Sequence, residues 1–378
     1  MKKRTALLLA AALLILLTAC GGASDAEPKD TPAAGPSADA SRPGQSTPVT
    51  LDVGLLGNSV KPVGVLVADS LGYFDEEGVD IHFEKVSSMN DAYTAVSTGD
   101  LDVYLFSSTA AATFISQGVT TLRVFGGTAG EGGEMMSAAG RGITLDSADD
   151  FKGLTIACQM PETSQMVLKD YLLKQGLTIG GPDSGADVSF VFVNDSNAAI
   201  IGCVNGAYDL CITNSCMGYY AADFGTELVG TVSDFVKPYP CCRQTCHSDT
   251  YVNEFDALVK FETAALRGYA YAREHEEETL DILEAYSGEE RDFLRAQVYG
   301  TDAYSPDMRL SLDPDKDACV AFYQAMENIG QIEPATEIDW SEYVVSDVYG
   351  SALEILSERE PDTALWGELT AYFTEHNS

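Results

Sequence analysis

Short apolar runs typical of β-strands alternate along the chain with longer runs that repeat apolar residues at helical spacing. Residues 49–56 are mainly apolar and residues 79–83 alternate apolar with polar positions, which predicts strands. The predicted strands are residues 49–56, 78–86, 102–106, 122–125, 154–158, 188–193 and 209–213. The predicted helices are residues 63–74, 91–98, 108–117, 163–175, 197–204, 215–224 and 251–273. Regular alternation of strand and helix predicts an α/β fold with mostly parallel sheets and helices on both faces.

Two such sets of elements follow one another, which predicts two doubly wound α/β lobes joined by a hinge. Between the sets, residues 126–133 contain five glycines, and we interpret them as crossover and binding loop together. We expect lobe 1 at residues 49–130, lobe 2 at 131–238, and a return to lobe 1 with C-terminal helices at 239–378. A chain that crosses twice between lobes leaves a cleft, the usual place for a small ligand.

The N-terminus has the features of a secretory signal. A basic start precedes an apolar run at residues 6–17, and Leu17-Thr18-Ala19-Cys20 closes it. This ending resembles the bacterial lipobox, so we expect residues 1–19 to be a lipoprotein signal peptide and Cys20 to be lipidated. Residues 20–48 lack a core-forming composition and predict a disordered, lipid-anchored tether. The protein is then expected at the extracytoplasmic face of the cell membrane; the alternative is an ordinary signal peptide with an accidental cysteine.

Charge and cysteine content narrow the range of partners. Lys and Arg number 22 against 58 Asp and Glu, for a formal net charge of -36, which would repel a phosphate backbone. We therefore expect no nucleic-acid partner, and we expect a monomer. The eight cysteines after Cys20 show no disulfide-framework spacing and predict mostly buried thiols.

Two motifs carry a family resemblance. Residues 68–80, ADSLGYFDEEGVD, and residues 95–103, AVSTGDLDV, resemble signatures of the nitrate/sulfonate/taurine-type substrate-binding proteins of ABC transporters. The resemblance implies a periplasmic-binding-protein-like type II fold and delivery of a small organic ligand or oxyanion to an ABC importer. It also implies a permease and an ATPase as partners, and it implies neither catalysis nor a cofactor.

A second branch of the same superfamily offers an alternative. The segment 239–244, YPCCRQ, is similar to its pyrimidine-binding branch, so the ligand is expected to be sulfonate-, nitrate- or taurine-like, or thiamine-pyrimidine-like. The alternative function is a pyrimidine-precursor synthase of thiamine biosynthesis built on the same fold. Secretion and the lack of a familiar catalytic motif count against an enzyme.

Candidate ligand contacts lie where predicted strands end and helices begin, because free N–H groups there favour anions and polar atoms. The residues at these positions are Asn58, Ser107, Ser108, Thr109, Gln159, Thr163, Ser164 and Asn214. The alternative for each is plain helix capping.

Two further candidates come from the segment after lobe 2. Arg243 is one of few cations and is expected to pair with an anionic ligand, or else to form a structural ion pair. Tyr239 is expected to stack on a ring, or else to pack in the interior. Cys241, Cys242 and Cys246 lie in a predicted cysteine-rich loop, 241–247. Their thiols lack CxxC spacing, so we expect no metal site there; the alternative is a soft-metal site in this loop.

Overall fold

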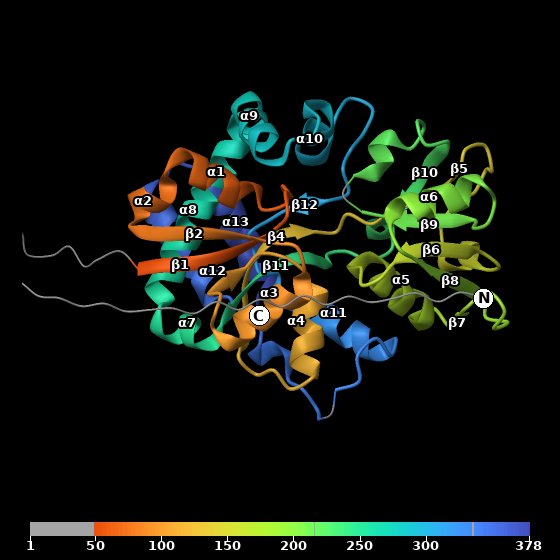
Figure 1. Ribbon diagram of the computed structural model, residues 1–378, viewed down its shortest axis with the longest axis horizontal. Coiled ribbons are helices and arrows are strands. Elements are labelled where there is room, and N and C mark those ends of the chain that lie inside the picture. Colours follow the sequence, from red (N-terminus) through yellow and green to blue (C-terminus); the bar gives the residue numbers. More distant parts are fainter. Residues whose placement is uncertain (1–48, 215, 335) are drawn as a thin grey trace, which may run out of the picture. The chain divides into compact units, whose positions relative to one another are not determined.

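The strands of the described chain form two six-stranded sheets with helices packed around them (Figure 1). The computed structural model describes residues 49–378 except 215 and 335, which belong to one compact unit, Thr47–Ser378. The predicted signal peptide, the tether and Cys20 lie outside the described residues. Within the described part, no helix has both the length and the apolarity needed to span a bilayer.

The first sheet has the strand order β12-β4-β11-β3-β1-β2. Its strands are β1 (Val49–Leu56), β2 (Val79–Val86), β3 (Val103–Tyr104), β4 (Leu122–Gly130), β11 (Pro240–His247) and β12 (Arg309–Leu310). β1 is parallel to β2 and β3, whereas β11 is antiparallel to β3 and β4. The chain thus returns to the middle of this sheet after building the second one.

The second sheet has the order β10-β5-β9-β6-β8-β7. Its strands are β5 (Glu134–Ala138), β6 (Thr155–Gln159), β7 (Ile179–Gly180), β8 (Val188–Val193), β9 (Leu210–Thr213) and β10 (Thr226–Thr231). β6 is parallel to β8 and β9, but β5 is antiparallel to β9 and β10. Most strands of each sheet run in the same direction, as expected, but both sheets are mixed: β5, β11 and β12 run against the other strands of their sheets.

Helices cover both sheets and supply the C-terminal part of the described chain. They are α1 (Val63–Leu71), α2 (Tyr73–Glu77), α3 (Met89–Thr98), α4 (Ser108–Ser116), α5 (Thr163–Lys174), α6 (Ser196–Val204), α7 (Ser248–Asn253), α8 (Phe255–Glu274), α9 (Glu276–Ser287), α10 (Arg291–Val298), α11 (Lys316–Asn328), α12 (Asp347–Arg359) and α13 (Ala364–His376). α8 packs against α1, α2 and α12, while α11 contacts both α4 and α5. α11 therefore bridges helices that belong to different sheets.

Glycine allows α1 and α8 to cross at close range. A Cβ atom on Gly268 would lie 2.1 Å from the carbonyl oxygen of Gly64, and one on Gly64 would lie 2.6 Å from that of Ala265. No side chain fits in that space. The motif residues Tyr73 and Phe74 belong to the same packing, since the Phe74 ring stacks on Phe261 of α8 at 5.3 Å.

Two segments differ from the predicted elements. Residues 126–130, expected in a loop, form the second half of β4. Glycine is needed at position 127 because a Cβ there would lie 2.5 Å from the Asp313 carbonyl oxygen. The helix expected at 215–224 is reduced to one 3₁₀ turn, Met217–Tyr220. The first difference arises from the pairing of these residues with β11 and β12, which local periodicity does not register.

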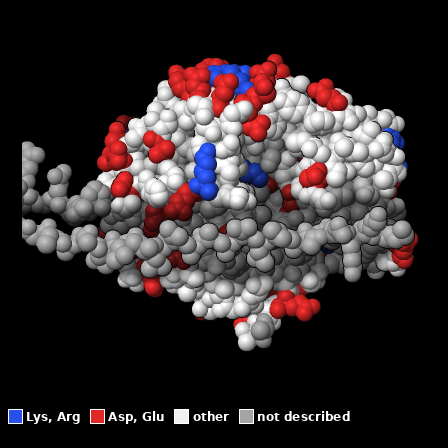
Figure 2. Space-filling model, viewed as in Figure 1, with Lys and Arg blue, Asp and Glu red and all other residues white. Residues whose placement is uncertain are grey.

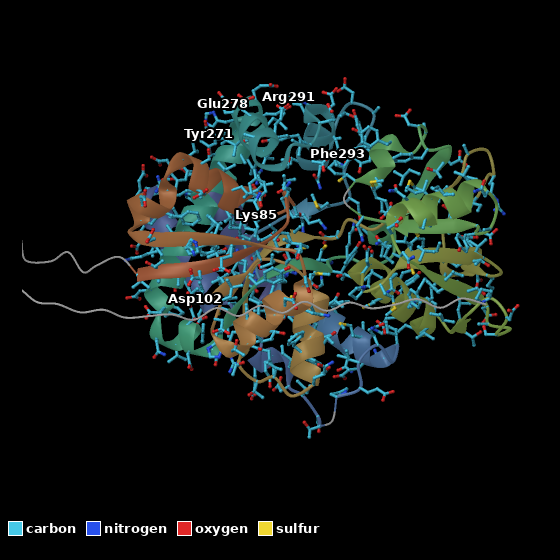
Figure 3. All side chains as sticks on the ribbon, viewed as in Figure 1. Lys85, Asp102, Tyr271, Glu278, Arg291 and Phe293 are labelled. Atoms are coloured by element: carbon cyan, nitrogen blue, oxygen red, sulfur yellow. The ribbon has the colours of Figure 1, made fainter. Side chains whose placement is uncertain are left out.

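Acidic side chains gather over α9 and α10 in the view of Figure 2, around a small basic cluster. Arg291, labelled together with Glu278 in Figure 3, contacts Glu277, Asp281 and Glu284 at 2.7, 2.7 and 3.2 Å. Each of these exposed ion pairs contributes little to stability. Because acidic side chains outnumber basic ones there, this face carries a net negative charge.

Candidate functional site

A cavity of about 250 Å³ lies where the loops of the two sheets meet. Its lining combines residues from the ends of β1, β3, β6 and β9, from the crossover after β4 and from β11. The lining residues are Leu56, Ser59, Lys61, Met89, Phe106, Ser107, Thr109, Glu131, Pro161, Glu162, Thr163, Ser164, Asn214, Cys241 and Cys242. Polar atoms thus enter the cavity from both sheets.

Two helix N-termini meet at this cavity. The Thr109 hydroxyl, in the first turn of α4, lies 3.4 Å from the Thr163 hydroxyl, in the first turn of α5. Neither first turn contains an acidic residue, and α5 has no side-chain cap. Free N–H groups and the partial positive charge of each helix end therefore favour an anionic or electron-rich group between them.

Ser107 enters the cavity with an unusual backbone. Its φ of 62° lies in the left-handed region, and its hydroxyl accepts a hydrogen bond from the Ala110 N–H at 3.2 Å. The buried Tyr93 hydroxyl donates to the Ser107 carbonyl at 2.9 Å and helps hold this conformation. Non-glycine residues in this region are uncommon and concentrate at functional sites.

Lys61 and Glu162 give the cavity groups of opposite charge. Burial alone would lower the pKa of Lys61, but Cys241, Cys242 and Glu162 raise it above its ordinary value, so the ammonium stays charged. Burial raises the pKa of Glu162 to about 7, against the opposing effect of Lys61. The carboxyl group is therefore partly protonated at neutral pH, while Lys61 remains available to an anion.

Glu131 links the cavity to the crossover segments. Its φ is 52°, and its N–H donates to the Tyr239 carbonyl at 3.1 Å, so the two crossovers run side by side. The Arg309 Nε donates to the Glu131 carboxylate at 3.2 Å. Burial raises the pKa of Glu131, although Arg309 acts in the opposite direction. A ligand in this cavity would therefore sit directly against the two crossover segments.

Five of the residues expected as ligand contacts line the cavity: Ser107, Thr109, Thr163, Ser164 and Asn214. Ser164 donates to the Asn214 side-chain oxygen at 3.0 Å. The sequence rule behind them selects polar residues between a strand end and a helix start, and the fold brings these five together from three separate segments.

Three other expected contacts lie elsewhere. Asn58 is exposed and accepts a hydrogen bond from Lys85 at 2.8 Å. Ser108 is fully buried and donates to the Tyr323 hydroxyl at 3.1 Å. Gln159 bonds to the Asn194 carbonyl at 3.1 Å and to Ser196 at 3.0 Å. Each side chain is occupied by a neighbour in the fold.

Arg243 and Tyr239 also lie outside the cavity lining. The fully buried Arg243 guanidinium contacts Asp315 at 3.0 Å and donates to the Ala129 carbonyl at 3.0 Å. Tyr239 accepts a hydrogen bond from the Gly133 N–H at 3.0 Å. Of the alternatives, the structure gives Arg243 the buried ion pair and Tyr239 the interior position.

Sequence reasoning did not single out Lys61, Glu131 and Glu162. Lys61 lies two residues before the start of α1 and Glu162 lies directly before α5, so the rule used for the other candidates, polar residues between a strand end and a helix start, also covers both. Glu131 lies between β4 and β5, where no helix start marks it. Its place in the cavity depends on the pairing of the two crossovers.

The described cysteines are free thiols. Seven are buried and Cys241 is half-buried, which confirms the expectation of mostly buried thiols. Cys241 and Cys242 line the cavity with their sulfur atoms 3.8 Å apart. The expected loop at this point is strand β11 instead.

Comparison with known proteins gives a consistent family match. The sequence profile of the NMT1/THI5-like family matches residues 60–279. No curated protein matches the chain.

Solved structures with the same fold include two periplasmic binding proteins. The aliphatic sulphonate binding protein SsuA from Escherichia coli is 15% identical, with a TM-score of 0.59, covering 80% of this chain and 99% of that one. The nitrate-binding protein NrtA from Synechocystis PCC 6803 is 14% identical, with a TM-score of 0.62, covering 82% and 89%.

An enzyme shares the fold as well. The desulfurization enzyme DSZB is 17% identical, with a TM-score of 0.54, covering 81% of this chain and 99% of that one. Identities this low show a shared fold, and function depends on the groups in the cavity.

Proposed function

The chain belongs to the NMT1/THI5-like family, and on that premise we propose that it is an extracytoplasmic solute-binding protein that delivers a small polar ligand to an ABC importer. One observation carries the proposal: the first turns of α4 and α5, from different sheets, meet across a cavity at 3.4 Å between Thr109 and Thr163. A ligand held by both helix ends stabilises the closed arrangement, and a transporter can recognise that arrangement.

The cavity favours a ligand with an anionic group. Lys61 supplies a full positive charge, and the N-termini of α4 and α5 supply partial ones. Thr109, Ser164 and Asn214 add hydroxyl and amide groups for hydrogen bonds. Sulfonates, nitrate and small carboxylates have this chemistry, and the volume of about 250 Å³ limits the ligand to a small molecule.

Placement at the membrane surface belongs to the same proposal. The basic start, the apolar run and the Leu17-Thr18-Ala19-Cys20 ending support export and lipidation of Cys20. A permease and an ATPase are the partners that a solute-binding protein requires.

A thermal-shift screen of the purified protein against alkanesulfonates, nitrate, taurine and thiamine pyrimidines tests the proposal. A micromolar ligand at millimolar concentration stabilises the folded state by about 4 kcal/mol, a shift of several degrees. Thr109→Val removes a cavity hydroxyl and should reduce the shift. Thr113→Val, one turn further along α4 and outside the lining, is the matched control.

An enzyme of the thiamine-pyrimidine type is the competing function. The thiols of Cys241 and Cys242 and the Glu162 carboxyl group bring reactive chemistry into the cavity, and DSZB shares the fold. Mass-spectrometric analysis of each thermal-shift hit after prolonged incubation separates the two. Unchanged ligand supports the binding protein, whereas a new product at catalytic turnover would contradict it.

A further inference from the structure

Two β-bulges bring a pair of adjacent thiols into the cavity. In a regular strand, successive side chains point to opposite faces of the sheet. The register of β11 against β4 shifts between Pro240 and Cys242 and again between Cys242 and Arg243. Bulges of this kind redirect side chains next to functional sites. As a result Cys241 and Cys242 both line the cavity, with 3.8 Å between their sulfur atoms.

The surroundings favour a thiolate in this pair. The Lys61 ammonium lies 3.6 Å from the Cys241 sulfur. The hydrogen bond from Cys241 lowers the pKa of Cys242 to about 6 despite burial, and Lys61 and Arg243 act in the same direction. The same hydrogen bond and burial raise the pKa of Cys241, so the pair loses one proton first and the two sulfurs share the other. Such thiols are nucleophilic at neutral pH.

Sulfur chemistry fits this pair better than an all-protein metal centre. Among the described residues, the one group of three or more clustered His, Cys, Asp or Glu ligands is Asp52, His82 and Glu84, which does not include the pair. Structural zinc sites use four protein ligands, and here the protein supplies two.

We propose that Cys241 and Cys242 form a thiol–disulfide exchange site that reacts with small disulfides entering the cavity. With the shared proton on Cys242, the thiolate of the more exposed Cys241 attacks one sulfur of the disulfide, whose S–S bond breaks and releases one thiolate. The Cys242 sulfur, after losing its proton to solvent, then attacks the Cys241 sulfur and releases the second thiolate. One small disulfide is reduced to two thiols, and the two cysteines are oxidised to one disulfide.

The oxidised pair is readily reduced again. Adjacent Cα atoms are about 3.8 Å apart, whereas most disulfides join Cα atoms about 4.4–6.8 Å apart. A disulfide between Cys241 and Cys242 is therefore strained, and strained disulfides have more oxidising potentials. The exchange site is thus reversible. Thiol–disulfide exchange at this site does not depend on the transported ligand. A negative result for the exchange and a negative result for the proposed transport function can therefore be told apart.

Release of 2-thiopyridone from 2,2′-dithiodipyridine by the folded protein tests the site. We expect the unmodified protein to release two equivalents more than the double variant Cys241→Ser/Cys242→Ser, a comparison in which the contribution of Cys20 cancels. Peptide mapping should then find a Cys241–Cys242 disulfide. Cys242→Ser should release one equivalent more than the double variant and keep a stable mixed disulfide on Cys241.

Buried thiols within the same chain provide an internal control. Cys203 and Cys211 are fully buried and outside the cavity, and they should stay unmodified while the protein is folded. Equal release from the unmodified protein and the double variant would overturn the proposal. So would a single equivalent with a lasting mixed disulfide in the unmodified protein, because Cys242 would then not complete the exchange.

Discussion

The hydroxyl oxygens of Thr109 and Thr163 lie 3.4 Å apart, although their helices, α4 and α5, follow strands of different sheets. The contact closes the cavity from two sides. It depends on the relative position of the sheets, and that position is held at Glu131 and Tyr239, where the crossovers bond to each other. A change at either hydroxyl therefore affects closure and ligand contact together.

Replacing Thr163 by Val should weaken ligand binding about fivefold, because a neutral hydrogen bond contributes about 1 kcal/mol. The measurement is calorimetric titration with the ligand found by the thermal screen. Thr113→Val should bind as the unmodified protein does. Equal affinities for all three proteins would remove the α5 N-terminus from the binding site.

Replacing Lys61 by Met should reduce affinity for an anionic ligand by more than tenfold, because charge-assisted hydrogen bonds contribute about 1.5–3 kcal/mol. Lys85, labelled in Figure 3, is a matched control on β2, outside the cavity lining. Lys85→Met removes the same charge from the chain and should leave affinity unchanged. A similar small loss in both variants would indicate a general charge effect instead of a contact.

Glu162 should make stability depend on pH. Its pKa is raised to about 7 in the folded protein, so the folded state holds the proton more tightly than the unfolded chain does. Its stabilising contribution is complete below about pH 4.3 and is lost as the pH rises through about 7. Glu162→Gln abolishes this titration.

Urea unfolding of both proteins between pH 4 and 8 measures the effect of Glu162. The stability of the unmodified protein relative to Glu162→Gln should fall as the pH rises, by an amount on the order of 1–3 kcal/mol. A difference that is constant across this range would show that Glu162 titrates normally in the folded state.

Replacing Arg243 by Met should destabilise the protein by about 3–5 kcal/mol, because it leaves Asp315 buried with less compensation. Arg309 also pairs with Asp315 and limits the loss. Chemical denaturation measures the change, and Arg243→Met/Asp315→Asn should recover part of it. A stable single variant with weakened ligand binding would instead support the role in anion binding expected from the sequence.

Replacing Cys20 by Ala should release the protein from membranes. Lipidation requires the thiol of Cys20, and in our proposal the attached lipid is what holds the protein at the membrane. Fractionation of cells after labelling with palmitate measures both membrane association and lipid incorporation. Label retained by Cys20→Ala would contradict lipidation at this residue.

Local sequence identified much of the fold. The strand at Val49–Leu56 and the strand at Val188–Val193 have the predicted bounds, because apolar patterning and turn residues act within a few positions. The motif around Tyr73 and Phe74 identified the family, as the profile match confirms. The strand β11 was missed since Pro240-Cys241-Cys242-Arg243 has no clear alternation, and its ladder is interrupted by bulges.

Sequence alone determined the α/β class, the family and five polar residues of the cavity lining, because each depends on short-range pattern. Tertiary structure decided the rest. It paired Arg243 with Asp315 in the interior, turned both thiols of the Cys241–Cys242 pair to the cavity, and added Lys61, Glu131 and Glu162 to the lining. These outcomes depend on where β11 inserts and how the crossovers align, which are contacts between residues about a hundred positions apart.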